Sequence, residues 1–416
     1  MNTLLKSVTI VDKTSVFHNN KVDLLIENGI ISNIDFNINN PKNYKEIDLT
    51  NLHVSRGWFD SSVCFGEPGF EERETISNGL KVASMSGFTS IALQPNTNPI
   101  SENRSQIEYI KNKSINELVE IHPIGALTKS NLELTEMYDM KNGGAICFGD
   151  YKTSITNPNT LKLALLYTAN FDGIILSFPE DKVLSNNGVM NENITSTSIG
   201  LKGSPSLSEH IQITRDLSIL EYTGGNLHIP TISTSKSVDI IREAKKKRLN
   251  VSCSVAVHNL FFSDNNLLDF NTNFKVLPPL RTKKDIQSLI DGVKDGTIDM
   301  VTSDHNPLNI ELKKTEFDNA EYGTIGLESF FGALNSIFST KMAVKILTNG
   351  KSIFNIPENK IEIGETANLT LFNPDKEYIF NKVNILSKSK NSIFENSKLR
   401  GVVYGTINKN KLSIHK

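Results

Sequence analysis

The feature that most limits the fold is a repeated alternation of short apolar runs with longer amphipathic segments between Gly57 and Thr340. The apolar runs suit buried strands, and the segments between them have apolar residues at three-to-four spacing, as in helices packed on one face. The strand candidates are residues 59–65, 89–94, 119–127, 144–149, 173–178, 226–233, 250–257 and 300–305. The helix candidates include 105–115, 160–171, 206–225, 236–249 and 283–296. Eight such units predict an α/β fold in which a (β/α)8 TIM-like barrel closes on itself.

Both ends of the chain have a different pattern, with β-like runs separated by turn signals. Asn28-Gly29 lies between two apolar runs, and residues 408–410 form a similar turn signal near the end. Such sequences are typical of β-hairpins. We therefore predict that residues 1–55 and 345–416 pair into one small β-sandwich domain, while residues 56–344 form the barrel.

Composition excludes several classes of function. The formal net charge of -2 provides no electrostatic attraction to nucleic acid or to an anionic membrane. No segment approaches the roughly 20 apolar residues that span a bilayer, and the first residues have no signal-peptide core. Cys64, Cys147 and Cys253 are far apart and odd in number, which fits reduced buried thiols better than disulfides or a zinc cluster. We predict a cytoplasmic protein that binds neither nucleic acid nor membrane.

In a barrel of this type the active site forms at the carboxyl ends of the strands. Among the residues at those ends, only Asp304 and the neighbouring His305 offer a strong acid or base. Asp304 is a candidate general base, or else a carboxylate held by hydrogen bonds in the interior. Cys64 is either a candidate nucleophile or an inert buried thiol.

Seven segments carry a resemblance to a known family. They are "EPGFEERETISNG" (67–79), "GFTSIALQPNTNP" (87–99), "NNGVMNE" (186–192), "GLKGSPSLSEHIQITRDL" (200–217), "NFKVLPPLRT" (273–282), "DGTIDMVTSDHNP" (295–307) and "GLESFFGALNS" (326–336). With these segments the chain resembles the dihydroorotases, which are cyclic amidohydrolases of the amidohydrolase superfamily, over essentially its whole length. The resemblance implies an amidohydrolase-type barrel, and in active relatives a zinc-dependent hydrolysis of a cyclic amide.

The same resemblance places unusual residues where active relatives bind zinc. The matching positions are Ser62, Cys64, Tyr151, Phe178, Thr231 and Asp304. Asp150 also stands where the family has an acid, whereas Lys152 is out of register for a carboxylated ligand. Because zinc needs three or four N, S or O ligands, we expect neither a metal nor any other cofactor here.

Substrate recognition is altered as well. The family's substrate-gripping arginine corresponds to Gly66, and two further recognition positions correspond to Leu277 and Leu308. Asn96 is the remnant that the resemblance assigns to substrate binding. Without the arginine, a bidentate contact to the substrate carboxylate has no donor.

Two functions remain open from the sequence. The first is a catalytically silent dihydroorotase-like protein with a structural or regulatory role in pyrimidine synthesis. The resemblance implies aspartate transcarbamoylase as its partner and a homo-oligomeric barrel. The second is an active hydrolase of a cyclic amide that uses Asp304, with a single metal held by Cys64, Asp150 and Asp304.

Overall fold

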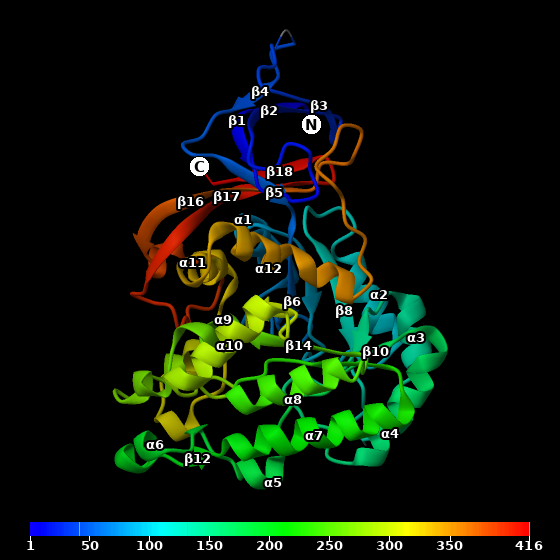
Figure 1. Cartoon of the computed structure of the whole chain (residues 1–416), viewed down its shortest axis with the longest axis vertical. Coiled ribbons are helices and arrows are strands. Elements are labelled where there is room, and N and C mark those ends of the chain that lie inside the picture. The colour runs from blue at the N-terminus through cyan, green and yellow to red at the C-terminus, as the bar shows by residue number, and fades with distance from the viewer. Residues whose placement is uncertain (41, 131, 416) are drawn as a thin grey trace.

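The computed structural model describes residues 1–40, 42–130 and 132–415 of the chain. Figure 1 shows two units, a barrel surrounded by helices and a smaller sheet that carries both chain ends. The barrel strands are β6 (Trp58–Val63), β7 (Phe88–Leu93), β8 (Glu120–Gly125), β9 (Cys147–Phe148), β10 (Ile174–Leu176), β13 (Asn226–Ile229), β14 (Val251–Ala256) and β15 (Met300–Thr302). They lie side by side in chain order, and the eight predicted strands are confirmed.

The barrel closes where its first and last strands end. Val63 bridges to His305 in parallel fashion, and the Cys64 N–H donates to the His305 carbonyl at 2.8 Å. Beside this bridge, the buried Asp60 carboxylate accepts hydrogen bonds from the backbone and the hydroxyl of Ser303. One acidic residue on β6 therefore fastens the segment that follows β15.

Asp60 makes stability depend on pH. Burial raises its pKa from 3.8 to about 6, although hydrogen bonds from Ser303 and its neighbours oppose the shift. The folded state therefore binds more protons than the unfolded state between about pH 4 and 6, and the stability contributed below that range is lost as the pH rises through about 6. Asp60→Asn resembles the protonated form at every pH. Its free energy of unfolding, relative to that of the native chain, should therefore rise by about 2–3 kcal/mol as the pH goes from 4 to 7.

Urea unfolding of both chains at the two pH values measures that gain. The control is Asp48→Asn, because Asp48 is exposed in the loop before β5 (His53–Arg56). A difference between Asp60→Asn and the native chain that does not change with pH would contradict the assignment.

Helices surround the barrel, and their bounds follow those of the structure. They are α1 (Ile76–Met85), α2 (Arg104–Asn112), α3 (Met137–Gly143), α4 (Pro158–Thr168), α5 (Lys182–Ser185), α6 (Ile194–Ile199), α7 (Ser206–Thr223), α8 (Ser235–Lys246), α9 (Val257–Phe261), α10 (Lys283–Asp295), α11 (Leu327–Ile337) and α12 (Thr340–Ile353). Short 3-10 turns lie at Ala169–Phe171, Asp264–Leu267, Thr272–Phe274, Ile310–Leu312, Phe317–Asn319 and Lys382–Asn384. Helices α4, α7, α8 and α10 pack in succession, and Figure 1 shows α4, α7 and α8 as neighbouring helices on the outside of the barrel. A further two-stranded sheet pairs β11 (Met190–Asn191) with β12 (Gly203–Ser204).

The smaller sheet joins the two chain ends. Its strands are β1 (Thr3–Ile10), β2 (Lys21–Glu27), β3 (Ile30–Asp35), β4 (Lys45–Ile47), β5, β16 (Leu369–Ile379), β17 (Lys398–Asn408) and β18 (Lys411–Ile414). They run in the order β18-β17-β16-β5-β1-β2-β3, with β4 beside β1. The hairpin predicted at Asn28-Gly29 is confirmed, since Glu27 pairs with Ile30 and the two turn residues have φ of 53° and 81°. Positive φ at both positions is the geometry of a type I′ turn.

The predicted domain boundary at residue 344 falls inside α12. This helix is continuous from Thr340 to Ile353 and packs against β6 and β15, so the barrel segment extends beyond that boundary. Among the described residues, no helix is long and apolar enough to cross a membrane.

Candidate active site

A small cavity lies at the carboxyl ends of the barrel strands, where the sequence predicted the active site. Its volume is about 20 Å³, which leaves room for about one water molecule. It is lined by Ser62, Gln94, Gly149, Asp150, Tyr151, Lys152, Leu176, Phe178, Pro230, Thr231 and Asp304. The fold thus brings five of the six predicted positions around one space, and the sixth, Cys64, lies close enough for the Tyr151 hydroxyl to lower the pKa of its thiol.

Asp304 is bound to the ammonium group of Lys152. The Lys152 Nζ lies 2.7 Å from Asp304 Oδ2, and the two side chains are 10% and 1% exposed. The other carboxylate oxygen receives only long hydrogen bonds, from Ser62 Oγ at 3.4 Å and the Tyr151 hydroxyl at 3.5 Å. Burial raises the pKa of Asp304, and the Lys152 ammonium opposes that shift. The dominant interaction at the cavity is therefore a buried internal ion pair.

Three residues at the cavity have a left-handed backbone. The φ angles are 49° at Lys152, 50° at Thr231 and 51° at Asp304. Such angles are uncommon for residues other than glycine and are especially unfavourable for a β-branched residue such as threonine. A conformation of this kind persists only where the surrounding structure enforces it, so the barrel, rather than local preference, sets how these side chains enter the cavity.

Cys64 does not have the properties of a reactive thiol. The residue is 2% exposed, and burial raises the pKa of its thiol to about 12, while hydrogen bonds from Tyr151 and Asn96 only partly oppose the shift. The thiolate is the nucleophilic and metal-binding form of cysteine. Cys64 is accordingly a neutral group at physiological pH, which agrees with the interpretation of an inert buried thiol.

Asp150 supports the neighbouring strand. Its Oδ1 accepts the backbone N–H groups of Leu127 and Thr128 at 3.0 and 3.2 Å, and its Oδ2 accepts the Thr128 hydroxyl at 2.8 Å. Both carboxylate oxygens are thus used to hold the segment after β8. The carboxylate that could have joined Asp304 at a metal is instead part of the scaffold.

The histidines near the strand ends are structural. The ring nitrogens of His228 contact two serine hydroxyls of β14 at 2.8 and 3.2 Å, and burial lowers its pKa to about 3. His305 uses Nδ1 to accept the backbone N–H groups of Gly326 and Leu327, so it holds the start of α11 rather than orienting Asp304. His258 is fully buried, and neither ring nitrogen has a hydrogen-bond partner within the described part of the chain.

Comparisons with known proteins agree with this architecture. Residues 53–237 match the family model described as dihydro-orotase-like. A dihydroorotase from Thermoanaerobacter sp. is 38% identical, with 98% of this chain and 96% of the relative covered. Another from Caldanaerobacter subterraneus subsp. tengcongensis is also 38% identical, over 93% of this chain and 92% of the relative. The chain belongs to the dihydroorotase family.

Solved structures of amidohydrolases share the fold of this dihydroorotase-family chain. The L-hydantoinase from Arthrobacter aurescens aligns with a TM-score of 0.85 at 19% identity, covering 100% of this chain and 96% of the hydantoinase. A D-hydantoinase aligns with a TM-score of 0.83 at 20% identity, covering 100% and 95% of the two chains. The expected α/β fold with an amidohydrolase-type barrel is confirmed.

The dihydroorotase family implies zinc, but the donor set at this cavity does not fit that ion. Phe178 offers no donor atom, and the Asp304 carboxylate is held by Lys152. A cation placed beside Asp304 would meet the Lys152 ammonium, whose like charge repels it strongly in a buried setting. No group of three or more His, Cys, Asp and Glu side chains is placed to hold a metal in residues 1–40, 42–130 and 132–415. Within the described residues, Cys64, Asp150 and Asp304 are thus not gathered around one point that could hold a metal.

The substrate-binding positions of the family are also occupied differently. Gly66 has a φ of 104°, and a Cβ atom there would lie 2.6 Å from the carbonyl oxygen of Phe70, so this backbone does not accommodate an arginine. Asn96 lies close enough to Cys64 to lower the pKa of its thiol. Leu308 is buried and Leu277 half-buried. The loops that would grip a carboxylate are packed internally.

Two residues of the site were missed by reasoning from the sequence. Lys152 was considered only as a metal ligand, and Gln94, whose amide donates to Ser62 Oγ at 3.1 Å, was not singled out. The available signal was position, since both follow a barrel strand directly or by a few residues. A basic residue near a strand end, such as Lys152, is a candidate partner for the carboxylate of Asp304.

Proposed function

We propose that this chain is a cytoplasmic, catalytically silent member of the dihydroorotase family that has a structural or regulatory role in pyrimidine biosynthesis. The observation that carries this proposal is the Lys152–Asp304 ion pair, with 2.7 Å between Nζ and Oδ2, in a cavity of about 20 Å³. The family relatives supply the pathway, since those compared are named dihydroorotase.

Two physical arguments support silence. A cavity of about 20 Å³ has room for about one water molecule, so a ring-shaped amide with a carboxylate does not fit the space that remains. A general base must also reach the proton that it removes, whereas Asp304 already binds an ammonium and lies among neutral hydroxyl groups. The same carboxylate that would act in hydrolysis here stabilises the closed end of the barrel.

We further propose that the chain works in an assembly, either as a homo-oligomer or with aspartate transcarbamoylase. The support is the family resemblance together with the outer helices α4 and α7, which expose large apolar side chains. These include Leu163, Leu166, Leu207, Ile211 and Tyr222. Gel filtration of the chain alone and mixed with the aspartate transcarbamoylase of the same organism measures the assembly. A monomer that fails to co-elute with that enzyme would contradict this part of the proposal.

The activity test uses the purified chain with added zinc. We expect no hydrolysis or synthesis of dihydroorotate above the protein-free rate, and less than stoichiometric metal by elemental analysis. The Thermoanaerobacter relative, prepared in the same way, is the positive control. Stoichiometric metal together with turnover that Asp304→Asn abolishes would overturn the proposal and support the active-hydrolase alternative.

A further inference from the structure

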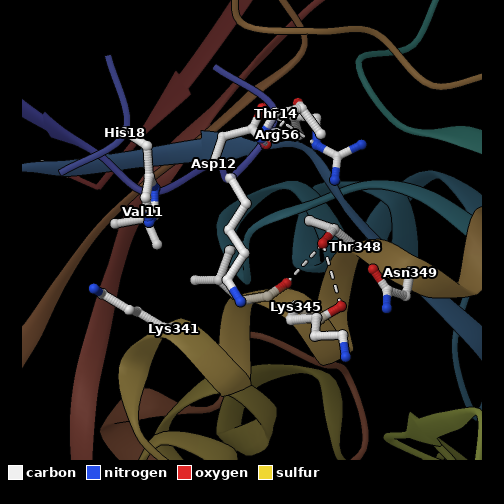
Figure 2. Close-up of a pocket in the computed structure, with 11 residues that line it drawn as sticks. Val11, Asp12, Thr14, His18, Arg56, Lys341, Lys345, Thr348 and Asn349 are labelled. Carbon is white, nitrogen blue, oxygen red and sulfur yellow. Dashed lines mark hydrogen bonds and ion pairs between the residues drawn. The ribbon is translucent and has the colours of Figure 1, made fainter. Parts of the chain in front are cut away.

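A second and larger cavity lies between the small sheet and α12. Its volume is about 170 Å³. Figure 2 shows Arg56 of β5, with Val11 and Asp12 from the segment after β1, facing Lys345, Thr348 and Asn349 of α12. Arg56 ends β5 just before β6 begins, so this cavity lies beside the amino-terminal end of the barrel. The candidate active site lies at the opposite, carboxyl end.

The wall of this cavity carries three uncompensated positive charges. Lys13, Lys341 and Lys345 line it and are exposed. Within the described part of the chain, none of these ammonium groups has a hydrogen bond or an ion pair with the protein. Lys341 and Lys345 are one turn apart on α12, where like charges destabilise a helix. Although the net charge of the chain is -2, three lysine side chains thus lie together around one cavity.

The one carboxylate in the wall does not cancel these charges. Asp12 has a side chain that is 1% exposed and lies 3.4 Å from Arg56 Nε. Its Oδ1 also accepts the backbone N–H and the hydroxyl of Thr14 at 3.0 and 2.9 Å. Arg56 is in turn paired with Glu358. The Asp12 and Arg56 charges are thus paired within the protein, whereas the three lysines have no such partner.

The rest of the lining suits a small molecule. The Thr348 hydroxyl donates to the Val344 carbonyl at 2.8 Å, which leaves its oxygen as an acceptor, and the amide of Asn349 supplies further hydrogen-bonding capacity. Val11 and Val344 form an apolar part of the wall. Pockets for drug-sized ligands measure about 300–1,000 Å³, so this cavity suits a smaller ligand.

We propose that this cavity binds a small phosphorylated metabolite. Three unpaired lysines around one cavity match a doubly charged phosphate, for which lysine is a point-charge partner. The valine side chains contact the organic part. Because Lys13 precedes β2 while Lys341 and Lys345 lie on α12, the bound phosphate joins the small sheet to the barrel.

The test measures binding to the full chain by calorimetry and by thermal unfolding at constant ionic strength. The probes are glycerol 3-phosphate, inorganic phosphate and chloride. We expect glycerol 3-phosphate to bind more tightly than inorganic phosphate and to raise Tm, with no effect of chloride. Lys341→Gln combined with Lys345→Gln should weaken binding at least about tenfold, because charge-assisted contacts are lost. Lys13→Gln should weaken it as well.

The matched control is Lys283→Gln with Lys284→Gln, which removes the same charge from exposed positions on α10. It should bind as the native chain does, and all variants should keep the native circular dichroism and the native Tm in chloride. The proposal would be overturned if the control lost as much affinity as the α12 double variant, or if the native chain bound both phosphates equally tightly. Full binding by Lys13→Gln would overturn it as well. Absence of binding by the native chain would do so too.

Discussion

Lys152→Met is expected to lower the free energy of unfolding by about 3–5 kcal/mol, because it leaves the Asp304 carboxylate buried without its charge partner. The Asp304 side chain is 1% exposed, and its remaining hydrogen bonds, from Ser62 and Tyr151, are long. Those hydroxyl groups cannot replace an ammonium at 2.7 Å. Urea unfolding at pH 7, followed by circular dichroism, measures the loss.

The double variant Lys152→Met with Asp304→Leu separates charge from packing. Since an apolar pair of similar volume can replace a buried ion pair at little cost, this variant should recover most of the stability. The matched control is Lys245→Met, because Lys245 and Asp299 form an ion pair at 2.6 Å whose side chains are 24% and 23% exposed. We expect that control to lose about 1 kcal/mol or less. If Lys152→Met and Lys245→Met lost the same free energy of unfolding, burial of the Lys152–Asp304 pair would not increase its contribution to stability.

Trp58→Ala is expected to lower the free energy of unfolding by about 3–5 kcal/mol, the usual cost of truncating a buried tryptophan. Trp58 is fully buried at the start of β6. Its ring centroid lies 4.8 Å from that of Phe331 on α11 and 5.6 Å from that of Phe372 on β16, and its Nε1 donates to Ser55 Oγ at 2.9 Å. The side chain thus ties barrel, outer helix and small sheet together.

Circular dichroism is used to follow this unfolding. Tryptophan fluorescence is not suitable, because Trp58 is the single tryptophan of the chain and the variant lacks it. Trp58→Phe keeps an aromatic ring at the joint and should lose clearly less. Tyr222→Ala is the exposed control, since Tyr222 is 82% exposed, and it should change stability by no more than about 0.5 kcal/mol. If Trp58→Ala cost as little as Tyr222→Ala, the joint between the two units would not depend on this cluster.

Most of the architecture was predictable because its signals are local. The last barrel strand and the hairpin at Asn28-Gly29 could be recognised from a few neighbouring residues; the structure contains the hairpin, and the strand predicted at 300–305 is observed at Met300–Thr302. The predicted boundary at residue 344 lies inside α12, because nothing local ends the helix there and it continues to Ile353. A helix end that depends on packing against β6 and β15 has only a weak signal in the local sequence.

The candidate site was predictable in its position but not in its chemistry. Strand order placed Ser62, Thr231 and Asp304 at one end of the barrel, and they line one cavity. The role of Lys152 was not predictable in the same way, because its partner is 152 residues away and its left-handed backbone is imposed by the surrounding barrel. Asp150 shows the reverse case, since a family-like acid proved to hold the segment after β8.

By itself, the sequence determined the succession of strands and helices, the turns and the residues available at each strand end, because these depend on neighbours within a few positions. The pairing of charges depends instead on how distant segments pack together. Closure of the barrel brought Lys152 to Asp304, and docking of α12 under the small sheet brought Lys13 to Lys341 and Lys345 around one cavity. Electrostatic and hydrogen-bonding partners depend on distance in space. A local sequence pattern does not contain the distance between residues that lie across a closed barrel.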